Sequence, residues 1–195
     1  MPQTQLIYSI SFIAILLSLS PAYSSATITE EAILNVNKDE VTTKQQKLRL
    51  QKTAGLLAEY EIEAKKLIDS LEEGADSQQL SNKAKSLLNL SEVVIESARF
   101  RLPQCDEYLS KTLQIKSQIV TISHNELEIG YHQDKALPKA SGECYHTKDL
   151  FIHPATVMVL TRDDPQLANA TKDSIKAEIN EVLAHTEIVR QLVIY

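Results

Sequence analysis

The stretch GYHQDKALPKASGECYHTKDLFIHPAT, residues 130–156, contains three of the five histidines and one of the two cysteines of the chain. Two interpretations compete. Either the histidines supply ligands to a metal ion, or a disulfide ties the stretch down as a loop. The residues on both sides favour the tethered loop, because they carry long helical patterns that this stretch connects.

Long amphipathic patterns precede this stretch. Apolar residues recur at alternating three- and four-residue steps, as they do on helices with one buried face. Gly74 and Gly130 each follow such a pattern, where a C-cap glycine is expected. Asp76 or Ser77 can cap the start of the second pattern, and the segment NVNKDE is expected to interrupt the first. The predicted helices cover 39–73, 77–101 and 105–129.

Another helix is predicted after the stretch. Asp164 is an expected N-cap and Pro165 an expected first helical residue, and apolar positions then mark one face as far as Val193. The turns at 74–76 and 102–104 are short, so successive helices are expected to be antiparallel neighbours. The sequence therefore predicts an all-α fold, an up-and-down four-helix bundle with a long disulfide-tethered connection between its third and fourth helices.

The connection itself, residues 131–163, is too long for a structureless loop in a compact domain. Its segments LFIH and ATVMVL are rich in β-branched and aromatic residues, which strands favour. We expect a short helix from Pro154 to about Arg162, with a β-ribbon as the alternative. In either form the segment is expected to lie as an apolar lid over one end of the bundle.

The N-terminus reads MPQTQLIYSISFIAILLSLSPAYSSA and contains no charged side chain. An apolar run followed by small residues predicts a secretory signal peptide over 1–26, which leaves one helical-bundle domain over 27–195. The protein is therefore expected in the periplasm or outside the cell, with no membrane span after cleavage. An uncleaved anchor is the alternative, because Lys and Arg are missing before the apolar run.

Cys105 and Cys144 are the two cysteines of the chain, and an even pair in an oxidising compartment is expected to form a disulfide. This bond closes a loop of about 39 residues, and the chain-entropy model assigns it roughly 4 kcal/mol of stabilisation. The bond would tie the long connection to the start of the third helix.

Charge and motifs exclude several function classes. The net charge is −6 with Lys and Arg scattered, which makes nucleic acid a poor partner. The chain has no glycine-rich phosphate loop, no Gly-x-Ser-x-Gly elbow and no His-Glu-x-x-His pair, so an enzyme is less expected than a non-enzyme. A binding or scaffolding function is predicted, with a protein partner or with self-association through the first helix as a coiled coil.

Metal binding is the alternative function. His132, His146 and His153 can hold zinc or copper if the fold brings them together. A copper site of the electron-transfer type would also need the thiolate of Cys144 and the thioether of Met158. The disulfide removes that thiolate, so such a site is not expected.

Three further residues are secondary candidates for a metal or haem site. His124, Glu128 and His132 recur at steps of four, which places them on one helix face, although on its polar side. His185 borders the inner face of the last helix and could pair with another His or with Met as an axial ligand of haem. Covalent haem attachment is not expected, because the Cys-x-x-Cys-His motif is missing.

Overall fold

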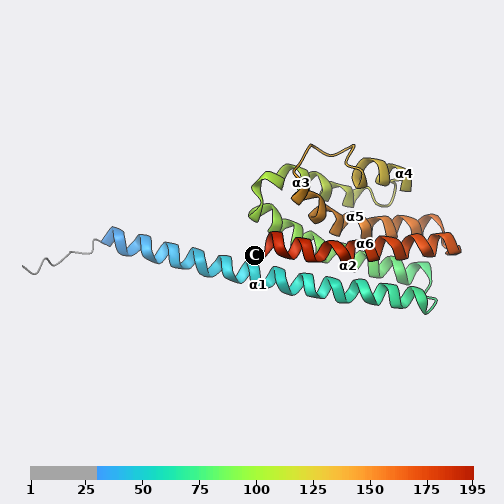
Figure 1. The fold of residues 1–195 in the computed structure, drawn as a ribbon, viewed down its shortest axis with the longest axis horizontal. Coiled ribbons are helices and arrows are strands. Elements are labelled where there is room, and N and C mark those ends of the chain that lie inside the picture. The colour runs from blue at the N-terminus through green and yellow to red at the C-terminus, as the bar shows by residue number, and fades with distance from the viewer. Residues whose placement is uncertain (1–29) are drawn as a thin grey trace, which may run out of the picture. The chain divides into compact units, whose positions relative to one another are not determined.

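The computed structural model describes the backbone of residues 30–195 and the side chains of residues 42–195 (Figure 1). The signal peptide predicted over 1–26 lies outside these residues. Among them all regular structure is helical, so the predicted all-α class is confirmed, and Glu40–Tyr195 form one compact unit. The elements are α1 (Glu30–Glu72), α2 (Ser77–Arg101), η1 (Pro103–Cys105), α3 (Asp106–Leu113), η2 (Gln114–Ser117), α4 (His124–Leu127), the π-helical turn η3 (Glu128–His132), α5 (Gly142–Asp163) and α6 (Asn169–Val193).

The helix predicted over 77–101 is confirmed at both ends as α2. Asp76 accepts a hydrogen bond from the backbone N–H of Gln79 at 2.8 Å, and the Gln79 side chain accepts one from the N–H of Asp76 at 3.0 Å. Gly74 has a φ of +87°, a conformation that glycine adopts without strain where a helix ends. The interruption expected in NVNKDE is wrong, because α1 is continuous from Glu30.

The helix predicted over 105–129 is wrong as a continuous element. The chain leaves regular helical geometry after Ser117, where four consecutive β-branched residues, Ile119 to Ile122, lose side-chain freedom in a helix. Arg162 of α5 donates to the carbonyl oxygens of Ile119 and Ile122, both at 2.7 Å. These bonds satisfy backbone groups that the interrupted helix leaves without partners.

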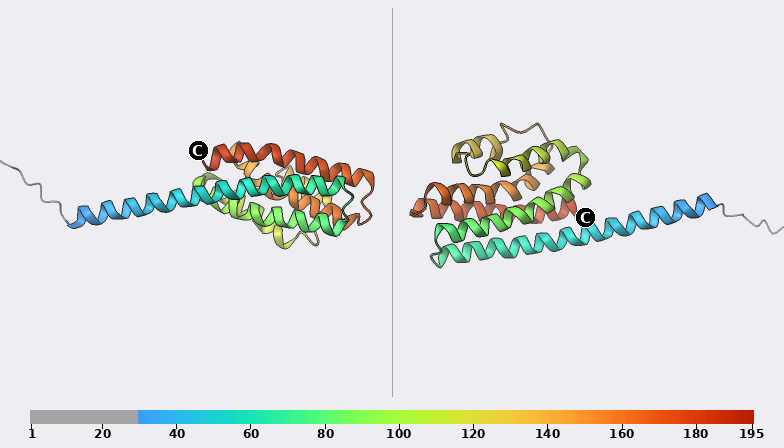
Figure 2. Two further views of the ribbon diagram at one scale, coloured as in Figure 1. Left: turned by 90° about the horizontal axis from the view of Figure 1, so that it is seen from below. Right: turned by 180° about the vertical axis from the view of Figure 1, so that it is seen from behind.

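The apolar lid expected of LFIHPATVMVL, residues 150–160, is also wrong, because this segment lies inside the long helix α5. The predicted start at Pro154 is 12 residues late, since α5 begins at Gly142. Every residue from Thr147 to Val157 is buried, and α5 packs along both α2 and α6 (Figures 1 and 2). The predicted up-and-down four-helix bundle is not confirmed, because its third helix is broken and the expected connection is a core helix.

Pro154 lies inside α5 without disrupting it. A proline has no N–H, so the carbonyl oxygen of Leu150, four residues earlier, loses its helical partner. The Tyr60 hydroxyl of α1 donates to this oxygen at 2.8 Å. Burial, with Asp149 nearby, raises the pKa of Tyr60 well above its ordinary value, so the hydroxyl keeps the proton that it donates. Tyr60 thus attaches α1 to the helix that carries most of the candidate site.

Replacing Tyr60 by phenylalanine should lower the free energy of unfolding by about 1–3 kcal/mol, because a buried carbonyl loses its only donor. Urea denaturation measures this cost. In a Pro154→Ala background the restored N–H can donate to Leu150, so the same substitution should cost less than about 1 kcal/mol. An equal cost in both backgrounds would show that the hydroxyl does not replace the bond that Pro154 removes.

The predicted disulfide between Cys105 and Cys144 is confirmed. The two Cα atoms lie 5.4 Å apart, and both side chains are fully buried. The bond joins the residue that precedes α3 to the first turn of α5. No helix among the described residues is long and apolar enough to cross a membrane.

Candidate metal centre

Two packed helices present a matching set of polar side chains. On α5 and on α6 three such residues recur at steps of three and then four, which places each set on one helix face. The helices α5 and α6 pack through a largely apolar core, and these residues bring titratable groups to it. The residues are His146, Asp149 and His153 on α5, and Glu178, Glu181 and His185 on α6.

Four imidazoles form a continuous row at this place. The ring centroids of His132 and His153 lie 4.9 Å apart, those of His153 and His185 5.6 Å, and those of His185 and His146 4.9 Å. His132 comes from the π-helical turn η3, and π turns are frequent at functional sites. The row therefore joins three consecutive elements of the chain, η3, α5 and α6.

Ligand atoms of His146, Asp149 and His185 lie within 4.8 Å of one another, and this set is called the Asp149 triad. The Asp149 side chain is 0% exposed, and each of its oxygens lies in an ion pair: Oδ1 is 3.1 Å from Nζ of Lys148 and Oδ2 is 3.0 Å from Nδ1 of His185. Neither contact has the alignment of a hydrogen bond. Each carboxylate oxygen can accept from more than one partner, so this buried group keeps acceptor capacity for a further ligand.

Lys148 does not satisfy Asp149, although its Nζ lies 3.1 Å from Oδ1. The buried ammonium donates to the carbonyl oxygens of Tyr131 and His132, both at 2.9 Å, and to Asp134 at 2.8 Å. These bonds use the three protons of the ammonium. Lys148 therefore holds the end of η3, and with it His132, against α5.

Neighbouring groups keep Asp149 ionised and His146 neutral. Burial alone raises the pKa of Asp149, but the nearby imidazole of His185 and ammonium of Lys148 outweigh it, so the pKa lies below its ordinary value. Burial and the proximity of His185 lower the pKa of His146. A metal ligand must be deprotonated, and both shifts favour the deprotonated form at neutral pH.

A second set, called the Glu181 triad, consists of His132, His153 and Glu181, with ligand atoms again within 4.8 Å of one another. Nδ1 of His132 is 2.9 Å from Glu128, and Nδ1 of His153 is 2.7 Å from Glu178. Nε2 of His153 is buried without a partner. A carboxylate on one nitrogen of an imidazole and a free second nitrogen is the arrangement of histidines that bind metals.

The histidines predicted as one ligand set are divided between the two triads. His132 and His153 belong to the Glu181 triad, and His146 belongs to the Asp149 triad. The secondary candidate His185 lies beside His146, and Glu128 lies behind His132 as its hydrogen-bond partner. His124 is exposed at the start of α4 and belongs to neither triad.

The three acidic residues of the centre were not predicted. Asp149 carries a signal only if residues 142–163 are recognised as a helix, because the steps of three and four then place it beside two histidines. The expected lid concealed this spacing. The acidic residues on α6 share its inner edge with His185, where a helical projection of the sequence would show them.

The geometry disfavours two of the alternatives. Neighbouring imidazoles meet edge to face at 4.9 Å, which leaves no space for a porphyrin between the rings of these pairs. Met158 lines a separate hollow with Arg162. Cys144 is oxidised in the disulfide, so a copper site of the thiolate type has no sulfur ligand.

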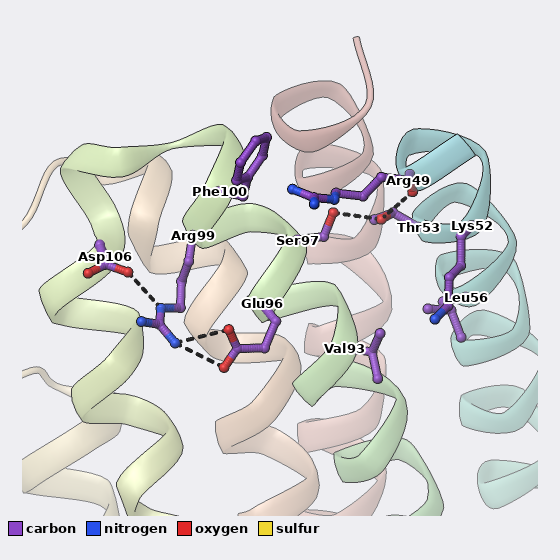
Figure 3. Close-up of a pocket in the computed structure, with 10 residues that line it drawn as sticks. All are labelled: Arg49, Lys52, Thr53, Leu56, Val93, Glu96, Ser97, Arg99, Phe100 and Asp106. Carbon is purple, nitrogen blue, oxygen red and sulfur yellow. Dashed lines mark hydrogen bonds and ion pairs between the residues drawn. The ribbon is translucent and has the colours of Figure 1, made fainter. Parts of the chain in front are cut away.

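A hollow of about 590 Å³ lies between α2 and the part of α1 that starts at Arg49 (Figure 3). Its two acidic residues are already paired, since Arg99 binds Glu96 at 2.9 Å and Asp106 at 2.8 Å. The Arg49 guanidinium lies 4.0 Å from the ring centre of Phe100. Among the described side chains that line this hollow no buried polar atom lacks a partner, so it is a weaker candidate than the histidine row.

Comparison of the chain with protein-family models, with curated proteins and with solved structures finds no match. The function is therefore argued from the geometry of the centre.

Proposed function

We propose that this protein is an exported metal-binding protein that holds a divalent transition-metal ion at the Asp149 triad. The observation that carries the proposal is the convergence of the fully buried Asp149 carboxylate with two imidazoles, whose ligand atoms lie within 4.8 Å of one another. A cation bound by His146, Asp149 and His185 would use acceptor capacity that the ion pairs of Asp149 leave open. Two helices fixed by core packing hold the ligands, as in metal sites built between helices of a bundle.

The donor set limits the metal. Two imidazoles and one carboxylate, with no thiolate, suit zinc, copper(II) or iron(II) and exclude sites that depend on soft sulfur ligands. Tetrahedral zinc has bonds of about 2.0–2.1 Å, so its ligand atoms lie about 3.3 Å from one another. Ligand atoms within 4.8 Å reach that spacing by small side-chain movements. Three protein ligands leave a fourth position for water.

Export is part of the proposal. It is supported by the uncharged apolar N-terminus with small residues after it and by the buried disulfide, since disulfides persist in oxidising compartments. An acidic chain outside the cytosol would meet metal ions that the cell has not yet taken up.

Zinc should stabilise the chelator-treated full chain, because an ion that binds only the folded state raises the free energy of unfolding. At a free zinc concentration 1,000 times the dissociation constant, the gain is about 4 kcal/mol. For a chain of this length that gain raises the melting temperature by about 8–16 °C. A thermal scan with zinc and one with magnesium as control measure it. No zinc-dependent shift, together with no zinc retained on dialysis, contradicts the proposed function.

The binding or scaffolding function predicted from the sequence stays a second candidate. The observation that favours it is the exposure of apolar side chains at the hollow of Figure 3, where Phe100 is 64% exposed and Val93 41%. Self-association through this face is the form that can be tested. Sedimentation of the full chain at rising concentration should then show a dimer that Phe100→Ser weakens, and a monomer at all concentrations would count against it.

A further inference from the structure

We infer that the centre holds two metal ions, the second bound by the Glu181 triad directly beside the first. This inference rests on the proposed function and assigns a ligand to a second set of residues, His132, His153 and Glu181. It is a separate claim, because the two triads share no residue and one can bind a cation without the other.

The Glu181 triad has the features of a prepared site. Each of its histidines has a carboxylate at Nδ1, Glu128 for His132 and Glu178 for His153, which fixes the ring and leaves Nε2 for a metal. His153 is 0% exposed and its Nε2 has no partner, so the protein buries a nitrogen that it does not satisfy.

The charges around the row allow two cations. Asp149, Glu181, Glu178 and Glu128 contribute four carboxylates within or directly behind the two triads. The buried cation, Lys148, lies between Asp149 at 3.1 Å and a further carboxylate, Asp134, at 2.8 Å, and Asp134 offsets its charge. Two divalent ions would therefore meet four negative charges, so the second ion enters a site whose charge is balanced.

The two ions would be neighbours. The rings of His153 and His185, one from each triad, have their centroids 5.6 Å apart and meet edge to face. His146, Asp149 and His153 also lie on one face of α5, which carries ligands of both triads. Two paramagnetic ions bound at neighbouring triads interact magnetically. This interaction gives a readout that does not depend on counting the bound ions.

Equilibrium dialysis of the chelator-treated full chain against zinc, with metal analysis of the retained protein, tests the inference. The wild type should retain two zinc ions per chain. Two variants of the Glu181 triad, Glu181→Gln at an exposed position and His132→Ala, should each retain one zinc ion. The variant His146→Ala in the Asp149 triad should also retain one. His124→Ala removes an exposed histidine outside both triads and should retain two. Glu178→Gln, which alters the partner of His153, should weaken the second site by about 10–100-fold.

Copper(II) gives the second readout. With two equivalents of copper(II), the wild type should give the electron paramagnetic resonance spectrum of a magnetically coupled pair of ions. Each variant that retains only one site should give the spectrum of an isolated copper(II) ion. One zinc ion in the wild type that Glu181→Gln leaves in place overturns the second site and leaves the proposed function standing. If the wild type retains one zinc ion and variants of either triad lose it, the two triads form a single shared site, and this result also overturns the inference. No retained ion at all overturns both claims.

Discussion

Asp149→Asn is expected to weaken zinc binding at the Asp149 triad by more than about 100-fold, because it replaces a charged ligand that lies within reach of two imidazoles. The pKa of Asp149 lies below its ordinary value, so the wild-type side chain is a carboxylate at neutral pH and needs no proton removed before it binds. The amide has nearly the same shape but neither the charge nor two equivalent acceptor oxygens. The loss therefore comes from the ligand and not from packing.

Calorimetric titration and thermal scans measure this effect on two scales. At the zinc concentration that stabilises the wild type by about 4 kcal/mol, a 100-fold weaker site gains only about 1.4 kcal/mol. The part of the zinc-dependent rise in melting temperature that comes from the Asp149 triad should fall from about 8–16 °C to about 3–6 °C. Asp173→Asn, an exposed aspartate of α6, is the matched control and should behave as the wild type. An unchanged zinc affinity in Asp149→Asn shows that this carboxylate only pairs with His185.

Removal of the disulfide by Cys105→Ala combined with Cys144→Ala should lower the free energy of unfolding by roughly 4 kcal/mol. The closed loop has a sequence separation of 39 residues, and opening it returns conformational entropy to the unfolded chain. The melting temperature should fall by about 8–16 °C. The double substitution avoids leaving a single reactive thiol in the core.

Reduction of the wild type under native conditions is the independent check on that value. The unfolding free energy of the reduced wild type, measured by urea denaturation, should agree with that of the double variant. A loss below about 1 kcal/mol in both would show that packing of α5 holds the fold without the covalent bond.

The parts of the fold that could be predicted are those in which a local pattern decides the structure. The capping box at Asp76 and the C-cap glycine at Gly74 fix the turn between α1 and α2 from a few residues. The last helix was predicted to begin at Asp164, but α6 begins at Asn169. The Asp164 side chain instead accepts hydrogen bonds from the N–H of Ala168 and the hydroxyl of Thr171. The sequence showed that Asp164 can accept backbone hydrogen bonds, but not that these bonds lie in the turn before α6.

The part that could not be predicted is α5. A helix buried on all sides shows no apolar stripe, so periodicity gives no signal, and its β-branched residues resemble a strand. Pro154 resembled a helix start because its tolerance depends on Tyr60, which is 94 residues away in the sequence. A local pattern cannot show a hydrogen bond of that range.

The candidate site could also be predicted only in part. The histidines were visible as residue types that bind metals, and the disulfide was visible from the count of cysteines. Their grouping was not, because it depends on the register of α5 against α6 and on the π turn that carries His132. Asp149 was missed for the same reason, since its burial and its position beside His146 and His185 are tertiary properties.

Anomalous diffraction at the zinc edge, from crystals of the chelator-treated protein grown with zinc, addresses metal binding at Asp149 most directly. The expected result is an anomalous peak at about 2.0–2.2 Å from ligand atoms of His146, Asp149 and His185. A map with no peak there, in which Asp149 remains beside His185 as it does without metal, would contradict the proposed function.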